Sequence, residues 1–157
     1  MTTFRIEPAV GADDIESVRG LFLRYAESLG FDLCFQGFDH ELAALPGQYA
    51  PPAGRLLLAR SADGTPSGCV GLRQLDAETC EMKRLYVAGE SRGLGLGRLL
   101  AQTIIVEARA AGYRRMRLDT LPTMTEAARL YEMLGFREIE PYYENPVAGA
   151  RFLELDL

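Results

Sequence analysis

Glu81-Met-Lys-Arg-Leu-Tyr-Val87 and, after a short polar gap, Arg92-Gly-Leu-Gly-Leu-Gly97 form the stretch that decides the fold. The first segment predicts a strand, and the glycines predict a turn that opens a helix over about 95–111. The first N–H groups of a helix have no partner inside it, and the helix dipole adds partial positive charge there. Glycine adopts the positive φ angles that point several N–H groups at one ligand. With Arg92 and Arg98 alongside, this order of elements predicts a phosphate site, most naturally for a pyrophosphate.

Two common nucleotide-binding motifs do not match this turn. A dinucleotide-binding turn places G-x-G-x-x-G directly after its strand, whereas here Ala88 to Ser91 intervene and Arg98 replaces the third glycine. A P-loop requires Gly-Lys followed by Ser or Thr, and Gly97 is followed by Arg98. A methyltransferase-like G-x-G-x-G turn stays open, with Asp119 at the end of a later strand as a ribose ligand, although the cationic Arg92 suits a phosphate better than a sulfonium cofactor.

The run Arg92-x-x-Gly95-x-Gly97 resembles the acetyl-CoA-binding signature of the GCN5-related N-acetyltransferases, the GNAT family. A second segment, Ala127-Ala-Arg-Leu-Tyr131-Glu-Met-Leu-Gly135-Phe136, is similar to a later helix of that family, which ends in a Leu-Gly-Phe turn. The two segments have the expected order and spacing. The resemblance implies one acyl-CoA N-acyltransferase domain over residues 1–157, with acetyl-CoA as the cofactor.

The hydrophobic pattern predicts a mixed α/β domain. Strands are expected over 3–7, 55–61, 67–75 and 79–87, the last three as an antiparallel meander, with helices over 11–29 and 40–45. A βαβαββ half should follow, with a strand over 115–119, a helix over 123–134 and strands over 137–140 and 151–156. The resemblance implies that these elements form a central splayed sheet flanked by helices.

Composition excludes several classes of function. Seventeen basic against 22 acidic residues give a net charge of −5, so a general nucleic-acid binder is not expected. The three cysteines are scattered and His40 is the one histidine, so neither a metal site nor a disulfide framework is indicated. Cys69 and Cys80 lie in apolar strands, where cysteine packs as a small hydrophobe. The chain shows no signal-peptide pattern and no apolar run of membrane-spanning length, so the expected location is cytoplasmic, without a membrane partner.

Acetylation of an amine by a thioester requires two proton transfers. An alkylamine with a pKa near ~10.4 is only about 0.04 % neutral at pH 7, a deficit of roughly 4.6 kcal/mol that a base must offset. By resemblance, Glu81 is the candidate base and Tyr131 the candidate acid for the departing thiolate. Glu81 would lie about 20 Å along the strand from Val87, a span of the order of an extended pantetheine arm.

The resemblance also assigns cofactor-binding and acceptor-binding residues. The candidates for binding coenzyme A are Leu85, Tyr86, Val87, Arg92, Gly93, Leu94, Gly95, Leu96, Gly97, Arg98 and Met124. At the position of Met124 many relatives carry a cofactor-contacting asparagine, which Thr123 or Thr125 could replace. The candidates for binding the acceptor are Phe31, Phe35, Tyr142, Tyr143 and Asn145. Arg73 and Arg84 could bind a substrate carboxylate, although arginines in strands more often face solvent.

Three functions remain open at this point. The first is an acetyl-CoA-dependent N-acetyltransferase that acts on a small-molecule amine, or a peptide, by direct transfer in a ternary complex. The second is a non-catalytic module that binds coenzyme A as a sensor or partner, and the third is a small methyltransferase. The sequence does not identify the acceptor or the length of the acyl group, and a homodimer is suggested by family analogy alone.

Overall fold

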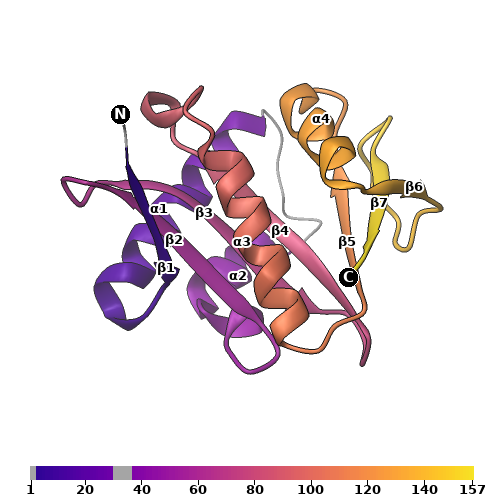
Figure 1. Ribbon diagram of the computed structural model, residues 1–157, viewed down its shortest axis with the longest axis horizontal. Helices are drawn as coiled ribbons and strands as arrows, with labels where there is room; N and C mark the ends of the chain where they lie inside the picture. The colour runs from indigo at the N-terminus through magenta and orange to yellow at the C-terminus, as the bar shows by residue number, and fades with distance from the viewer. Residues whose placement is uncertain (1–2, 30–36) are drawn as a thin grey trace.

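The computed structural model describes residues 3–29 and 37–157, and its strands form one seven-stranded sheet in the order β1-β2-β3-β4-β5-β7-β6 (Figure 1). The strands are β1 (Phe4–Pro8), β2 (Arg55–Ser61), β3 (Pro66–Gln74), β4 (Thr79–Val87), β5 (Arg115–Thr120), β6 (Arg137–Ile139) and β7 (Arg151–Asp156). The helices are α1 (Gly11–Leu29), α2 (Phe38–Ala44), α3 (Leu96–Ala110) and α4 (Thr125–Leu134), with short 3-10 turns η2 (Gly47–Tyr49) and η3 (Gly89–Ser91).

The sheet splays between its two halves. Strands β1 to β4 pair antiparallel in sequence order, so the predicted meander is confirmed. The pairing of β4 with β5 is parallel and covers only three residue pairs, from Thr79↔Arg115 to Glu81↔Arg117. Beyond Glu81, the edge of β4 that faces β5 has no strand partner within the described part of the chain. Its backbone groups are therefore available to a ligand.

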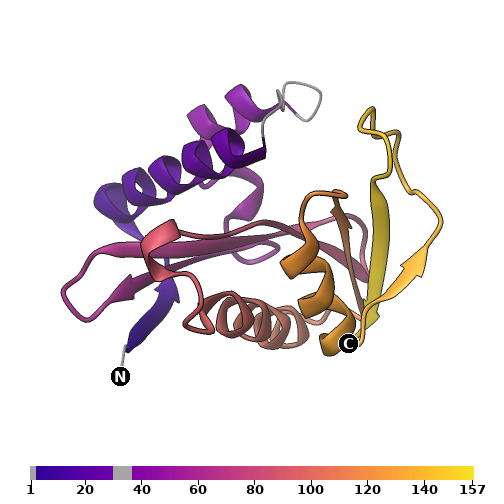
Figure 2. The ribbon, with the colours of Figure 1, turned by 90° about the horizontal axis from the view of Figure 1, so that it is seen from above.

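Helices cover both faces of the sheet. In Figure 2, α1 and α2 lie on one side, and α3 and α4 lie side by side on the other. Each face has its own apolar core: Leu100, Ile104 and Tyr131 belong to the core under α3 and α4, and Val18 and Phe22 to the core under α1 and α2. The amphipathic stripes that predicted these helices therefore face the sheet.

The predicted elements are present, and their boundaries differ by at most two residues. The helix that follows the glycines begins at Leu96, because Gly95 caps it with a left-handed backbone at φ 80°. Gly93 is left-handed too, with φ 79°, as expected for this turn. The short helix begins at Phe38, two residues earlier than predicted, after a left-handed Gly37.

A bulge interrupts the ladder between β3 and β4, where the register shifts between Cys69 and Gly71. Opposite it lies Arg84, which has φ 61° and is the one non-glycine residue with positive φ in the described ranges. The sequence-based expectation that Arg84 faces solvent is wrong, because its side chain is buried and donates from Nε and Nη2 to the Glu41 carboxylate, at 2.9 Å each. The bulge thereby joins β4 to α2.

Candidate active site

The splay between β4 and β5 opens into a cleft of about 640 Å³. Three structural units line it: the second half of β4, the glycine-rich turn with the start of α3, and the start of α4. The end of α1 also lines it. The lining residues are Tyr25, Ser28, Leu29, Leu85, Tyr86, Val87, Arg92, Gly97, Arg98, Thr123, Met124, Thr125, Glu126, Ala127 and Leu130.

Seven of the eleven residues predicted to bind coenzyme A line this cleft: Leu85, Tyr86, Val87, Arg92, Gly97, Arg98 and Met124. Gly93 and Gly95 shape the turn through their positive φ angles and do not line the cleft. The side chain of Leu94 is about half exposed, whereas Leu96 points into the core, so Leu96 could offer a ligand only its backbone.

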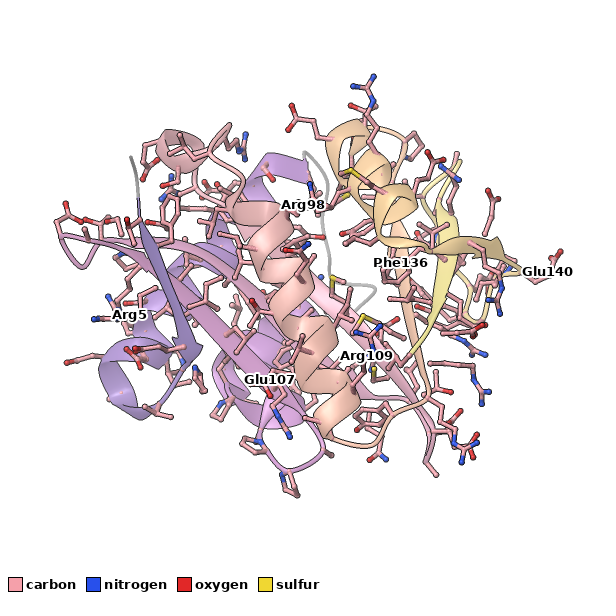
Figure 3. All side chains as sticks on the ribbon, in the orientation of Figure 1. Arg5, Arg98, Glu107, Arg109, Phe136 and Glu140 are labelled. Carbon is pink, nitrogen blue, oxygen red and sulfur yellow. The ribbon has the colours of Figure 1, made fainter. Side chains whose placement is uncertain are left out.

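One end of the cleft is suited to an anion. The side chain of Arg92 is held by a hydrogen bond from Nε to the carbonyl of Val87, at 3.1 Å, and lies 5.6 Å from the centre of the Tyr86 ring. Its two Nη groups donate no hydrogen bond to a described residue. Arg98 extends from the first turn of α3, whose capping residue Gly95 offers no side-chain hydrogen bond (Figure 3). Two guanidinium groups and the start of α3, with its unpaired N–H groups, therefore line the same cleft.

Sequence analysis gave no cofactor-binding role to residues of α1, or to Ala127 and Leu130 of α4. The structure shows that Tyr25, Ser28 and Leu29 of α1 line the cleft, and so do Ala127 and Leu130. The regular spacing of these residues along their helices could have placed them on one face, but not opposite β4. The substitutes for the missing asparagine, Thr123 and Thr125, both line the cleft beside Met124.

Tyr131 lies in α4 under the cleft, and its side chain does not line the cleft. It is 4 % exposed and packs edge-on against Phe136, with ring centres 5.6 Å apart. Burial raises the pKa of Tyr131, and the neighbouring Tyr25 and Asp119 add to the effect. A raised pKa keeps the phenol protonated at neutral pH, which is the form that an acid requires.

Glu81 stands where β4 and β5 separate, at the last residue pair that they share. Its side chain is 1 % exposed. One carboxylate oxygen accepts a hydrogen bond from Nε of Arg73 at 2.6 Å, and the other accepts one from the hydroxyl of Tyr142 at 2.5 Å. Arg73 is therefore paired with Glu81 and is only partly exposed. Burial alone would lower the pKa of Arg73, but the charge of Glu81 raises it.

The predicted acceptor residues Tyr142, Tyr143 and Asn145 lie together in the connection between β6 and β7. The hydroxyl of Tyr143 donates to the Asp119 carboxylate, and Asn145 donates to the same oxygen at 3.1 Å. Asn145 is thus part of the internal bonding of this connection, and Tyr142 is the one of the three that reaches Glu81. Phe31 and Phe35 lie outside the described residues.

The pKa values of Lys83 and of two cysteines also bear on the chemistry of the site. Burial lowers the pKa of Lys83 to about 8, and the charges of Arg84 and Arg73 contribute to the lowering. Cys69 and Cys80 are fully buried, as predicted for small hydrophobes, and burial raises the pKa of both thiols, to about 12 for Cys80. The described residues include no cluster of groups that could hold a metal ion and no helix long and apolar enough to cross a membrane.

The chain shares its family and its fold with known proteins. Residues 21–136 match the family model described as acetyltransferase (GNAT) family. An uncharacterized N-acetyltransferase of Schizosaccharomyces pombe is 44 % identical over 145 residues, which are 92 % of this chain and 89 % of the relative. A second one, from Dictyostelium discoideum, is 32 % identical and covers 92 % of this chain and 95 % of its own. A GNAT-family acetyltransferase from Staphylococcus aureus has the same fold, with a TM-score of 0.82 at 21 % identity over 98 % of this chain and 99 % of its own.

Proposed function

The chain belongs to the GNAT acetyltransferase family, and on this basis we propose that it moves the acetyl group of acetyl-CoA to a primary amine of a small molecule or peptide. The observation that carries the proposal is the splay of β4 from β5, with Arg92 and Arg98 at one end of the opening and Glu81 at the other. We propose that residues 1–157 act as one catalytic domain and that transfer is direct, in a ternary complex. A cytoplasmic location and a homodimer remain expectations.

Several features of the cleft support acetyl-CoA as the donor. Arg92, Arg98 and the N–H groups at the start of α3 would bind the pyrophosphate. The unpaired edge of β4 around Leu85 and Val87 would hydrogen-bond the pantetheine arm as an added strand would. This arrangement leads the arm along β4 toward Glu81. The bound donor supplies the thioester, and the protein orients it and moves the protons.

The two candidate proton-transfer residues belong to different elements, Glu81 to β4 and Tyr131 to α4. Glu81 lies where β4 leaves β5, and there it would take the proton that the acceptor ammonium must lose. Tyr131, kept protonated by burial, would give its proton to the departing thiolate. Cys69 and Cys80 have raised pKa values and stay protonated, which supports direct transfer over an acyl-cysteine intermediate.

The methyltransferase alternative loses its structural support. Nucleotide folds of that kind use a mostly parallel sheet, whereas β4 with β5 is the one parallel pair among the described strands. Asp119, the candidate ribose ligand, already accepts hydrogen bonds from Tyr143 and Asn145. The non-catalytic sensor remains the second candidate.

Thermal unfolding with ligands tests the donor site. Acetyl-CoA at about 100 times its Kd is expected to add roughly 2.7 kcal/mol to the free energy of unfolding and to raise Tm by roughly 5–10 °C. Coenzyme A should act similarly, and S-adenosylmethionine should leave Tm unchanged. No shift with either coenzyme A species would contradict the proposed donor site. A shift without turnover on a broad panel of amines would favour the sensor.

Reversal of one charge tests the pyrophosphate end. Arg92→Glu is expected to weaken acetyl-CoA binding by roughly 10²-fold, because a charge-assisted hydrogen bond of about 1.5–3 kcal/mol is lost and repulsion is added. Arg109→Glu is the matched control, since Arg109 is exposed at the far end of the same helix as Arg98 (Figure 3). Calorimetry should show an unchanged Kd for the control. Equal Kd values for the two variants would refute this placement of the pyrophosphate.

A further inference from the structure

The carboxylate of Glu81 is enclosed by two hydrogen-bond donors. Nε of Arg73 approaches one oxygen at 2.6 Å and the hydroxyl of Tyr142 approaches the other at 2.5 Å, while Glu81 itself is 1 % exposed. An acceptor amine therefore cannot lie against Glu81 without displacing one of these donors. Either the amine breaks this arrangement in each turnover, or the proton reaches Glu81 through one of the two donors.

Only one of the two donors can pass a proton on. The guanidinium of Arg73 has no acceptor site, and its pKa is raised by the charge of Glu81, so it neither accepts a proton nor gives one up. A phenol differs, because its oxygen carries lone pairs while its hydrogen points to another group. Tyr142 is half-buried, and while its hydrogen is donated to Glu81 the lone pairs of its oxygen can accept a hydrogen from another donor.

The position of the Tyr142 hydroxyl does not depend on Glu81 alone. The ring packs against Phe152 with centres 5.2 Å apart, and the guanidinium of Arg117 lies 5.4 Å from its centre. Burial and the negative charge of Glu81 raise the pKa of Tyr142, so the hydroxyl keeps its hydrogen at neutral pH. Packing therefore holds a protonated phenol against the buried carboxylate.

We propose that Tyr142 is a catalytic residue that relays the proton of the acceptor ammonium to Glu81. The N–H bond of the ammonium breaks as a new O–H bond forms on Tyr142, and the original O–H bond of Tyr142 breaks as Glu81 Oε2 gains that hydrogen. Tyr142 ends neutral, the amine is free to attack the thioester, and Glu81 later returns the proton to solvent by the reverse path. This inference rests on the proposed function, because it assigns a role within that reaction.

The charged groups around the relay are the same in every variant that the test requires. Glu81 faces Arg73 from β3 and Lys83 from its own strand. Tyr142 faces Arg117 and Asp119 from β5, and the neighbouring Tyr143. Lys83, with its pKa of about 8, titrates in the range of the experiment. Its contribution is common to all the enzymes compared and does not distinguish them.

A tyrosine outside the site provides a matched control. Tyr113 is buried, and its hydroxyl donates to the backbone carbonyl of Ala53 at 2.6 Å. Tyr113 neither lines the cleft nor bonds to Glu81. Tyr142→Phe and Tyr113→Phe therefore each remove one hydroxyl that donates a hydrogen bond, and only the first interrupts the relay.

The experiment compares wild type, Tyr142→Phe and Tyr113→Phe with a reactive amine. Tyr142→Phe should lower kcat by roughly 10²-fold, the low end for a lost acid–base step, with the Kd for acetyl-CoA unchanged. The rate of this variant should keep rising with pH toward the pKa of the amine. The variant can use only amine that is already neutral in solution, and that fraction grows with pH. Tyr113→Phe should keep the kcat and the pH profile of wild type. Equal kcat values for Tyr142→Phe and wild type would overturn the relay and leave the proposed function standing.

A measurement on the wild type alone keeps the inference testable if the variants fold poorly. Two protons move together in the relay. A plot of kcat/KM for a slow amine against the deuterium fraction of the solvent should therefore be curved. A straight line would indicate one moving proton and overturn the relay. Absence of turnover by the wild type on any amine would remove the relay and the proposed function together.

Discussion

Glu81→Gln is expected to lower kcat by roughly 10²–10⁴-fold, the range for loss of a general base. Glutamine keeps the size of the side chain and an oxygen that can accept the hydrogen bond of Tyr142. The fold should therefore persist while the proton acceptor is lost. Without a base, the variant can use only the amine that is already neutral in solution. Its rate should therefore rise by roughly tenfold per pH unit up to the pKa of the amine.

The control for this variant is Glu78→Gln, which alters an exposed carboxylate in the turn before the same strand. Its kcat and pH profile should match those of wild type. Steady-state kinetics across pH, with acetyl-CoA binding measured in parallel, separates a chemical defect from a binding defect. A pH profile of Glu81→Gln that coincides with that of wild type would remove Glu81 as the base.

Glu41→Ala is expected to reduce the free energy of unfolding by about 3–5 kcal/mol, because it leaves the buried charge of Arg84 without its bidentate partner. At roughly 2–4 °C per kcal/mol for a chain of this size, the fall in Tm should be at least about 6 °C. Asp39→Ala changes an exposed acid of the same helix and should cost at most about 1 kcal/mol. Urea unfolding measures both variants, and equal losses would contradict the ion-pair argument.

The same ion pair makes stability depend on pH. Burial alone would raise the pKa of Glu41, but the hydrogen bonds and charge of Arg84 outweigh it and hold that pKa below its usual value. A carboxylate with a depressed pKa stabilises the fold above its unfolded pKa, about 4.3, and this contribution is lost as the pH falls further. The stability difference between wild type and Glu41→Ala should therefore shrink below about pH 4.

Local signals account for the parts of the structure that were predicted correctly. Apolar segments bounded by turn residues placed β2, β3 and β4, and left-handed glycines such as Gly95 set the start of α3. The anion end of the cleft was predictable for the same reason, since Arg92, Gly97 and Arg98 are close in sequence and belong to one turn. In such a segment, backbone geometry alone brings the side chains together.

Arg84 shows where local patterns stop being informative. Its place in a strand favoured a solvent-facing side chain, because arginines in strands more often face solvent. In the structure, the bulge interrupts the regular ladder at this point, and the guanidinium bonds to Glu41, which is 43 residues away. The residues next to Arg84 in the sequence indicate neither the bulge nor Glu41 as the partner of Arg84.

By itself, the sequence determined the order of the strands and helices, the turn that presents Arg92 and Arg98, and the likeness to an acetyltransferase. Only the tertiary structure decided that β4 separates from β5 beyond Glu81. It also decided that Tyr142, 61 residues further along the chain, donates a hydrogen bond to the Glu81 carboxylate. The physical reason is the range of the interactions. Helix periodicity, strand alternation and capping act within a few residues, whereas the splay and the contact with Tyr142 depend on how finished elements pack against one another.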